Sequence, residues 1–192
     1  MAQGEAIDMA RRDELVEQLA SRSRSKRQEA AHELAAMARV DAGAMVTIVD
    51  DLLRALELPE AQTRWECLDA LSEVVLVDPT RAPEAFDGAE EALFDEGAAA
   101  THLSAFRFLS RYGSLNPDAS ERVWPLMREA IQCYHGDPEY REMLICLLHF
   151  ARGSIAPEVA EALIERMKFD AKNGSGFYRA YSTEICSTLR RT

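Results

Sequence analysis

Positive charge is scarce in this sequence. Lys and Arg together account for 22 of the 192 residues, against 33 Asp and Glu, which gives a formal net charge of −11. A protein that grips a phosphate backbone needs clustered cations, so this balance disfavours a general role in nucleic-acid binding. It favours a partner with a basic or mixed-charge surface.

Long apolar runs and a leader pattern are missing as well. No segment approaches the roughly 18 apolar residues that a membrane helix requires. The first eight residues, from Met1 to Asp8, lack a basic start followed by an apolar run. We therefore expect a soluble, cytoplasmic protein that has no membrane partner.

Cysteines are few, and their spacing suggests no chemistry. Cys67, Cys133, Cys146 and Cys186 show neither zinc-type pairing nor close disulfide spacing, so we expect reduced thiols and a cytosolic location. Cys146 and His149 lie three residues apart and form half of a metal site, but neighbouring positions of the pattern complete no zinc set. We predict no metal and no cofactor, and no nucleophile with its base stands out.

The sequence does contain a helical pattern that recurs five times. Its head positions follow one another at spacings of 37, 38, 39 and 38 residues. The heads are Arg27, Arg64, His102, Arg141 and Arg179; three positions later come Ala30, Cys67, Ala105, Leu144 and Ser182; seven positions later come Leu34, Leu71, Leu109, Leu148 and Cys186. Positions 0, 3 and 7 share one side of an α-helix, and a helical period near 40 predicts stacked repeats.

Ten helices in five antiparallel pairs follow from this pattern. Asp78-Pro79, Asn116-Pro117 and Ala156-Pro157 mark the starts of new units, because proline is tolerated in the first helical turn. We predict first helices over 12–20, 44–56, 82–94, 119–133 and 158–169, and second helices over 26–39, 61–77, 98–112, 138–152 and 177–190. Residues 1–10 are expected to be frayed or a cap, 11–192 a single domain, and 172–176 a flexible connector.

Two stretches carry a family resemblance. Residues 15–38 and 63–75 are similar to HEAT repeats, with a leucine-bearing first helix, a short loop, then a basic residue, small residues and a leucine. The resemblance implies an all-α fold, a right-handed superhelix of the HEAT-like (armadillo-like) solenoid type with about five antiparallel helix pairs. In that family the second helices line a concave face that holds a peptide, a protein surface or occasionally nucleic acid.

The predicted partner-binding residues are Trp65, Asp69, Leu103, Arg107 and Arg111. Corresponding positions of stacked helices lie about 8–10 Å apart, so Trp65 and Leu103 would form an apolar pair flanked by Asp69 and Arg107. Tryptophan and arginine are the residue types that most often anchor a partner. The alternative is that neighbouring helices cover these side chains as ordinary packing.

An enzymatic alternative rests on the same residues. HEAT-like alkylpurine DNA glycosylases resemble this chain in using tryptophan, aspartate and arginine on the concave face, where Asp69 would stabilise a developing positive charge. The net charge, the lack of a basic stripe and the lack of a second tryptophan near Cys146 oppose this alternative. A surface ion pair between Asp69 and Arg107 explains the same residues. We therefore favour a non-enzymatic protein-binding or peptide-binding scaffold, whose oligomeric state the sequence does not specify.

Two basic features have structural explanations. The recurring head arginines are expected to form hydrogen bonds between repeats or to pack with their aliphatic stems. The basic run 21–27 is expected to be a polar loop between helices, with Ser25 as the N-cap of the next helix. Contact between this run and a phosphate or an acidic partner is the alternative.

Overall fold

The described residues of the computed structural model, 7–95 and 98–191, form ten α-helices and two short 3-10 helices and contain no strand. The predicted all-α solenoid is confirmed. The chain divides into two compact units, residues 1–108 and 109–192, which are described separately below. No helix in the described part of the chain is long and apolar enough to cross a membrane.

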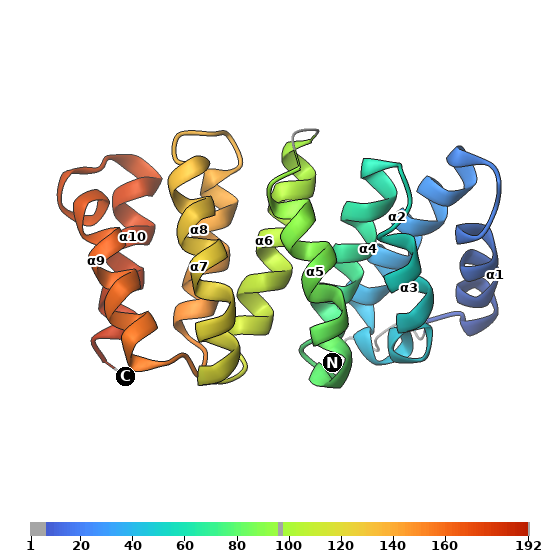
Figure 1. The fold of residues 1–192 in the computed structure, drawn as a ribbon, viewed down its shortest axis with the longest axis horizontal. Coiled ribbons are helices and arrows are strands. Elements are labelled where there is room, and N and C mark those ends of the chain that lie inside the picture. The colour runs from blue at the N-terminus through green and yellow to red at the C-terminus, as the bar shows by residue number, and fades with distance from the viewer. Residues whose placement is uncertain (1–6, 96–97, 192) are drawn as a thin grey trace, which may run out of the picture. The chain divides into compact units, whose positions relative to one another are not determined.

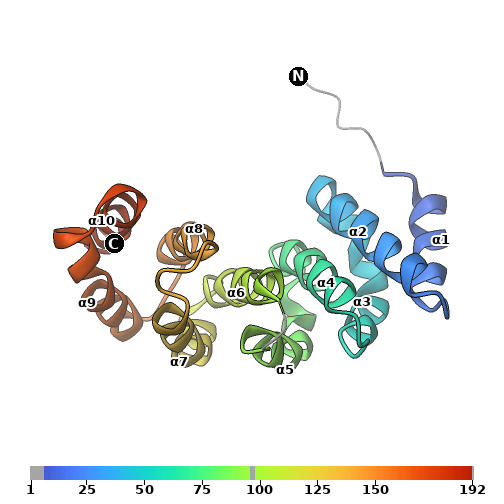
Figure 2. The same ribbon diagram turned by 90° about the horizontal axis from the view of Figure 1, so that it is seen from above.

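The first unit is built from paired helices and two 3-10 segments. Its elements are α1 (Met9–Leu19), α2 (Arg24–Val40), η1 (Ala42–Ile48), α3 (Val49–Ala55), α4 (Ala61–Val74), η2 (Pro79–Arg81), α5 (Ala82–Leu93) and the first part of α6 (Ala99–Gly113). Helix α2 packs between α1 and α4, and α4 also packs against α3 and α5 (Figure 1). Seen from above, α2 and α4 lie on one side of this unit, and α3 and α5 lie on the other (Figure 2).

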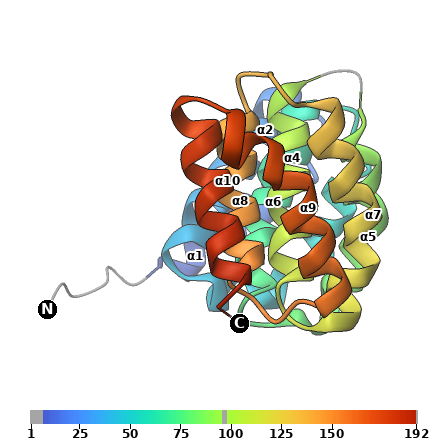
Figure 3. The same ribbon diagram turned by 90° about the vertical axis from the view of Figure 1, so that its left-hand side faces the viewer.

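The second unit repeats the pairing. It contains α7 (Pro117–Cys133), α8 (Tyr140–Ala151), α9 (Pro157–Asn173) and α10 (Gly176–Leu189). Helix α10 packs against both α8 and α9, and α9 also contacts α7. Figure 3 shows α9 and α10 running side by side. The loop before α9 is tied back by two hydrogen bonds, from Ser154 N to Ser114 O (2.8 Å) and from Ala156 N to Ser120 Oγ (2.9 Å).

The predicted helix starts at the proline positions are confirmed for α7 and α9. Pro117 and Pro157 are the first residues of their helices, where a missing N–H leaves no helical hydrogen bond unmade. The side chain of Asn116 accepts a hydrogen bond from Ala119 N at 2.9 Å and so caps α7. Asp78 instead caps η2, so the pair Asp78-Pro79 starts a 3-10 turn just ahead of α5.

The prediction of one continuous helix over 44–56 is wrong. That segment divides into η1 and α3, which meet at Ile48 and Val49. The buried Arg12 of α1 donates hydrogen bonds to Ala44 O (2.6 Å) and Thr47 Oγ1 (2.9 Å). The run Val46–Val49 is β-branched at each position and a weak helix former, so this outside hydrogen bonding competes well with a regular α-helical turn.

Three smaller expectations also need correction. The predicted connector 172–176 is shorter, because α9 continues to Asn173 and α10 begins at Gly176. Ser25 is inside α2, whose N-cap is Ser23. Residues 1–6 of the predicted frayed segment lie outside the described residues, while Met9 and the residue after it belong to α1.

The inner stripe of the repeat is confirmed. The side chains three and seven positions after each head are all buried: Ala30, Cys67, Ala105, Leu144, Ser182, Leu34, Leu71, Leu109, Leu148 and Cys186. Burial in every repeat shows that these positions face the packed interior of their own units. The sequence period therefore identifies the core of both units.

The position just before the head carries a buried hydroxyl in three consecutive repeats. Thr63, Thr101 and Tyr140 are fully buried, and none of their hydroxyl oxygens has a hydrogen-bond partner among the described residues. A buried hydroxyl without a partner costs free energy that an apolar side chain of the same shape does not. This position is therefore a place where the fold can be made more stable.

Leu71→Ala should destabilise the protein by about 2–5 kcal/mol, because Leu71 is 4% exposed and its truncation leaves a cavity in the core of the first unit. Denaturant unfolding followed by circular dichroism measures the change. The control is Glu29→Ala on the exposed side of α2. Equal effects of the two substitutions would contradict the inner stripe.

Thr63→Val should leave the fold unchanged and raise the free energy of unfolding by about 1 kcal/mol, since it removes a buried unpaired hydroxyl without changing the side-chain shape. Thr183→Val, at an exposed position of α10, serves as the control and should have little effect. Thermal unfolding of the two variants tests this. A loss of stability at Thr63 would mean that a buried water hydrogen-bonds the hydroxyl.

Candidate partner-binding face

The recurring head residue holds loops and neighbouring repeats together in the first unit. The guanidinium of Arg27 donates to Ser21 O (2.7 Å), in the loop before its own helix, and pairs with Glu60, the N-cap of α4. Arg64 likewise reaches Leu58 O (3.4 Å) and pairs with Asp95. These contacts confirm the structural interpretation of the arginines and leave them unavailable as a free basic stripe.

The head residues of later repeats behave differently. The ring of His102 keeps the loop contact, with Nε2 hydrogen-bonded to Asp95 O. Arg141 is exposed and pairs with its neighbour Glu142 at 2.7 Å, and Arg179 is also exposed. Recurrence in sequence therefore marks one structural role in the first unit and a surface position in the second.

A row of alternating charges joins three second helices in the first unit. Arg107 Nη1 of α6 donates to Asp69 Oδ1 of α4, as predicted for this pair. The other carboxylate oxygen, Oδ2, lies 3.8 Å from Arg39 Nη1 at the end of α2. The Asp69 side chain is only 15% exposed, so two guanidinium groups occupy most of its surroundings. We call Arg39, Asp69 and Arg107 the charged row.

Arg39 belongs to this row although the sequence analysis missed it. It stands in the last turn of α2, one turn beyond the positions that the repeat pattern compares. The available signal was a cation twelve positions after a head, but only the stacking of α2 on α4 shows that it faces Asp69. Both ends of the row carry positive charge, and its centre carries one negative charge.

The predicted apolar pair lies one helical turn before the charged row. Trp65 precedes Asp69 by four residues on α4, and Leu103 precedes Arg107 by four residues on α6. Both side chains are half-buried, neither enclosed in the core nor fully exposed. Arg111 lies one turn further along α6 and is also half-buried. The spacing of one turn, about 5.4 Å, keeps the four residues of the first unit within reach of one short ligand segment.

A second contact between α2 and α4 lies beside this face. His32 Nδ1 is 2.9 Å from Glu66 Oε1, and the Glu66 side chain is 10% exposed. Together with the charged row, this contact makes the α2–α4–α6 side a mixture of positive and negative groups. The net negative charge of the whole chain is therefore not expressed on this face.

Metal and thiol chemistry has little support in the part of the chain that the structure describes. No group of three or more His, Cys, Asp or Glu side chains is placed to hold a metal ion there. Cys146 is buried and His149 is exposed, so the two do not share one environment. Burial raises the pKa of the Cys67 thiol and, to a lesser depth, that of Cys186. All four cysteines are free, and a raised pKa makes the two thiols poor nucleophiles.

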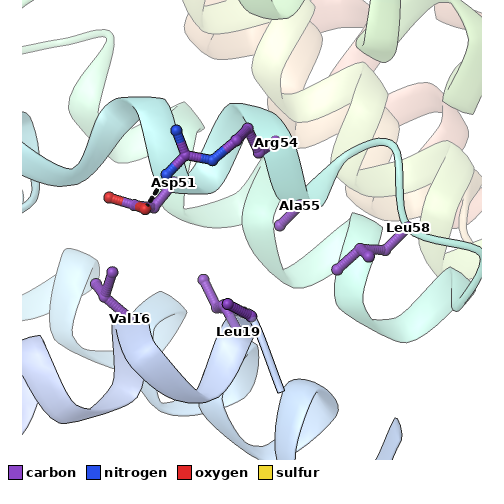
Figure 4. A pocket seen from close by; sticks show the side chains of 7 residues that line it. Val16, Leu19, Asp51, Arg54, Ala55 and Leu58 are labelled. Atoms are coloured by element: carbon purple, nitrogen blue, oxygen red, sulfur yellow. Dashed lines mark hydrogen bonds and ion pairs between the residues drawn. The ribbon is translucent and has the colours of Figure 1, made fainter. Parts of the chain in front are cut away.

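An apolar cavity of about 210 Å³ lies between α1 and α3. Figure 4 shows Val16 and Leu19 of α1 facing Ala55 and Leu58, while Arg54 is paired with Asp51. The cavity is smaller than the roughly 300–1,000 Å³ of typical small-molecule sites and has no convergent set of polar groups beyond that pair. It is best explained as a packing defect beside the short helix α3.

Comparison with known sequences gives no match, neither to a protein family nor to a curated protein. Solved structures give several similar folds. An engineered protein aligns over 97% of this chain and 100% of its own, with a TM-score of 0.65 and 16% identity. A designed armadillo repeat protein in complex with the peptide (KR)4 aligns over 91% of this chain and 80% of its own, with a TM-score of 0.69 and 14% identity.

A natural protein shares the same architecture. The armadillo-repeats-only protein of Plasmodium falciparum aligns over 98% of this chain and 100% of its own, with a TM-score of 0.62 and 14% identity. At these identities the likeness concerns the fold alone. The fold is an armadillo-like helical repeat.

Acidification should remove the contribution of the Arg27–Glu60 pair. Hydrogen bonds from Arg27 lower the pKa of Glu60 below its ordinary value. Its stabilising effect is therefore complete above the unfolded-state pKa of about 4.3 and disappears as the pH falls through the lower folded-state pKa. Glu60→Gln should cost about 1.5–3 kcal/mol at neutral pH, the usual contribution of a charged hydrogen bond.

The free energy of unfolding of wild type and variant, measured from pH 7 to about pH 3, tests this linkage. The difference between the two proteins should shrink on the acid side. Glu57→Gln, an exposed carboxylate nearby, should show almost no difference at any pH. A difference for Glu60→Gln that stays constant with pH would contradict the pairing.

Proposed function

We propose that this chain is a non-enzymatic scaffold that binds a peptide or helix of a partner protein on the α2–α4–α6 side of its first unit. The observation that carries the proposal is the half-buried Trp65 one turn before the charged row. A large aromatic side chain at the edge of ion-paired groups has the composition of a binding hot spot, with an apolar anchor surrounded by polar contacts. Leu103 extends the apolar anchor, and Arg111 continues the polar contacts along α6.

The chemistry of this face favours a mixed-charge partner. The charged row offers two guanidinium groups for one carboxylate, so an acidic side chain of a ligand can share Arg39 or Arg107. The carboxylate of Asp69 can accept from a basic neighbour in the same ligand. Alternating charge beside an apolar residue is therefore the ligand pattern that fits the row.

Two similar structures support binding of this kind. One is a designed armadillo repeat protein in complex with the peptide (KR)4, and another was designed for modular peptide recognition. Both share the fold of this chain at low identity, so they support a peptide-binding scaffold without defining its ligand. They leave the sequence specificity to the side chains on the face.

The HEAT-type assignment of the repeats belongs to the same proposal. HEAT repeats have two helices and armadillo repeats have three. The first, fourth and fifth repeats consist of two helices each, whereas η1 and η2 add a third segment to the second and third repeats. We propose HEAT-type repeats in which two units carry an armadillo-like addition. A cytoplasmic location is supported by the four free cysteines.

The glycosylase alternative gains no support from Asp69. Its carboxylate lies between two guanidinium groups, which is the geometry of an ion pair between stacked helices. A carboxylate that stabilises a departing base must face the substrate with its charge available. The contact between Asp69 and Arg107 supports the scaffold interpretation of the same residues.

Trp65→Ala should leave the melting temperature within a few degrees of wild type but weaken ligand binding by at least about thirtyfold, the equivalent of a hot spot of ~2 kcal/mol. Peptides selected from a random display library against wild type provide the ligands. Intrinsic fluorescence in a Trp124→Phe background reports binding at Trp65 alone, because the chain has two tryptophans.

The other tryptophan supplies the matched control. Trp124 is 8% exposed in α7, so Trp124→Ala should cost about 3–5 kcal/mol through cavity formation. Destabilisation of similar size by Trp65→Ala would assign Trp65 to packing and refute its role as an anchor. Selected peptides that bind Trp65→Ala as tightly as wild type would place the binding site elsewhere.

A further inference from the structure

A second groove lies between α3 and α5, on the side of the first unit away from α2 (Figure 2). It has a volume of about 410 Å³ and continues into a further space of about 280 Å³. Leu56, Glu57, Gly88 and Glu91 line both parts, so the two spaces form one groove. Its size falls within the range of ligand-binding clefts.

The groove exists because α3 is short. Helix α3 has seven residues and ends at Ala55, whereas α5 has twelve. Beyond Ala55 the chain turns through Leu56 to Pro59, and no helix covers the facing surface of α5 along this stretch. Gly88 brings α5 close to the turn, since a Cβ there would meet Leu56 Cδ1 at 3.0 Å. Leu53 and Leu56 form an apolar floor that solvent reaches.

The negative charge of the chain is concentrated around this groove. Residues 50–95 contain 13 of the 33 acidic residues but only 3 of the 22 Lys and Arg. All three arginines of that segment are already paired. Arg81 pairs with Asp50 (2.5 Å) and Glu84, Arg64 pairs with Asp95, and Arg54 pairs with Asp51 beside the α1 cavity (Figure 4).

Three carboxylates on the groove walls are left without a cation. Glu57, Asp87 and Glu91 are exposed, and none of them forms an ion pair with a described residue. Asp87 and Glu91 stand four residues apart on α5, where like charges repel each other. A cationic ligand would relieve this repulsion, and the apolar floor would receive the apolar part of the same ligand.

We propose that the α3–α5 groove binds a basic amphipathic segment of a partner protein, with its Lys or Arg side chains on Glu57, Asp87 and Glu91 and its apolar residues on Leu53 and Leu56. Charge complementarity selects the cations, and the leucine floor selects a segment that also carries apolar side chains. The chain's own basic run, residues 21–27, lacks apolar side chains and does not fit the floor. This inference does not depend on the Trp65 face, which lies on other helices.

The probe is a fluorescein-labelled synthetic helical peptide with leucines on one face and lysines on the other, titrated with the full chain and followed by fluorescence anisotropy. The triple variant Glu57→Gln, Asp87→Asn and Glu91→Gln should bind it about tenfold more weakly, as expected when three exposed ion pairs are lost. The matched control, Glu121→Gln, Glu129→Gln and Glu158→Gln, changes the net charge equally at exposed carboxylates of the second unit and should change binding less than twofold.

Further arms separate the possible explanations. A peptide with the same lysines but serine in place of leucine should bind about tenfold more weakly, because it lacks contact with the floor. Trp65→Ala should bind the probe like wild type, which distinguishes this groove from the first proposed site. Equal losses in the two triple variants would show non-specific attraction and overturn the proposal. Concentration-dependent dimerisation that the groove variant abolishes would make a second copy the occupant and also overturn it.

Discussion

The first unit depends on one interaction, a guanidinium that reaches in two directions at once. Arg27 and Arg64 each donate to a carbonyl of the loop before their own helix and to a carboxylate at the start of the next second helix. The loop contact fixes how the two helices of a repeat join, and the carboxylate contact fixes how one repeat stacks on the next. Arginine suits this role because its planar group presents several donors at a fixed geometry.

This interaction also explains what the sequence could and could not predict. The head and the buried stripe repeat at constant spacing, so helix positions and the core could be read directly, including Leu71 and Leu148. The partners Glu60 and Asp95 stand 33 and 31 residues after their arginines, because the intervening loops differ in length. A period search cannot detect a contact whose spacing varies, although acidic residues near the starts of α4 and α6 were a visible signal.

Tertiary contacts account for the other differences. The segment 44–56 has apolar spacing that fits a helix, but Arg12, more than thirty residues earlier, binds the carbonyl of Ala44 and the hydroxyl of Thr47. Local propensity cannot anticipate a hydrogen bond from another helix. At the candidate site, the pairing of Asp69 with Arg107 followed from the repeat pattern, whereas the contribution of Arg39 required the stacking of α2 on α4.

The shortened α3 connects fold irregularity with charge. Division of the predicted helix into η1 and α3 leaves only seven residues to cover α5, and the uncovered part of α5 carries Asp87 and Glu91. If α3 were as long as α5, these carboxylates would face another helix and would need internal partners. The mixed charges of the α2–α4–α6 side and the unpaired acids of the α3–α5 groove are therefore two chemically different surfaces of one unit. A scaffold with two such surfaces has the means to hold a mixed-charge segment on one side and a basic segment on the other.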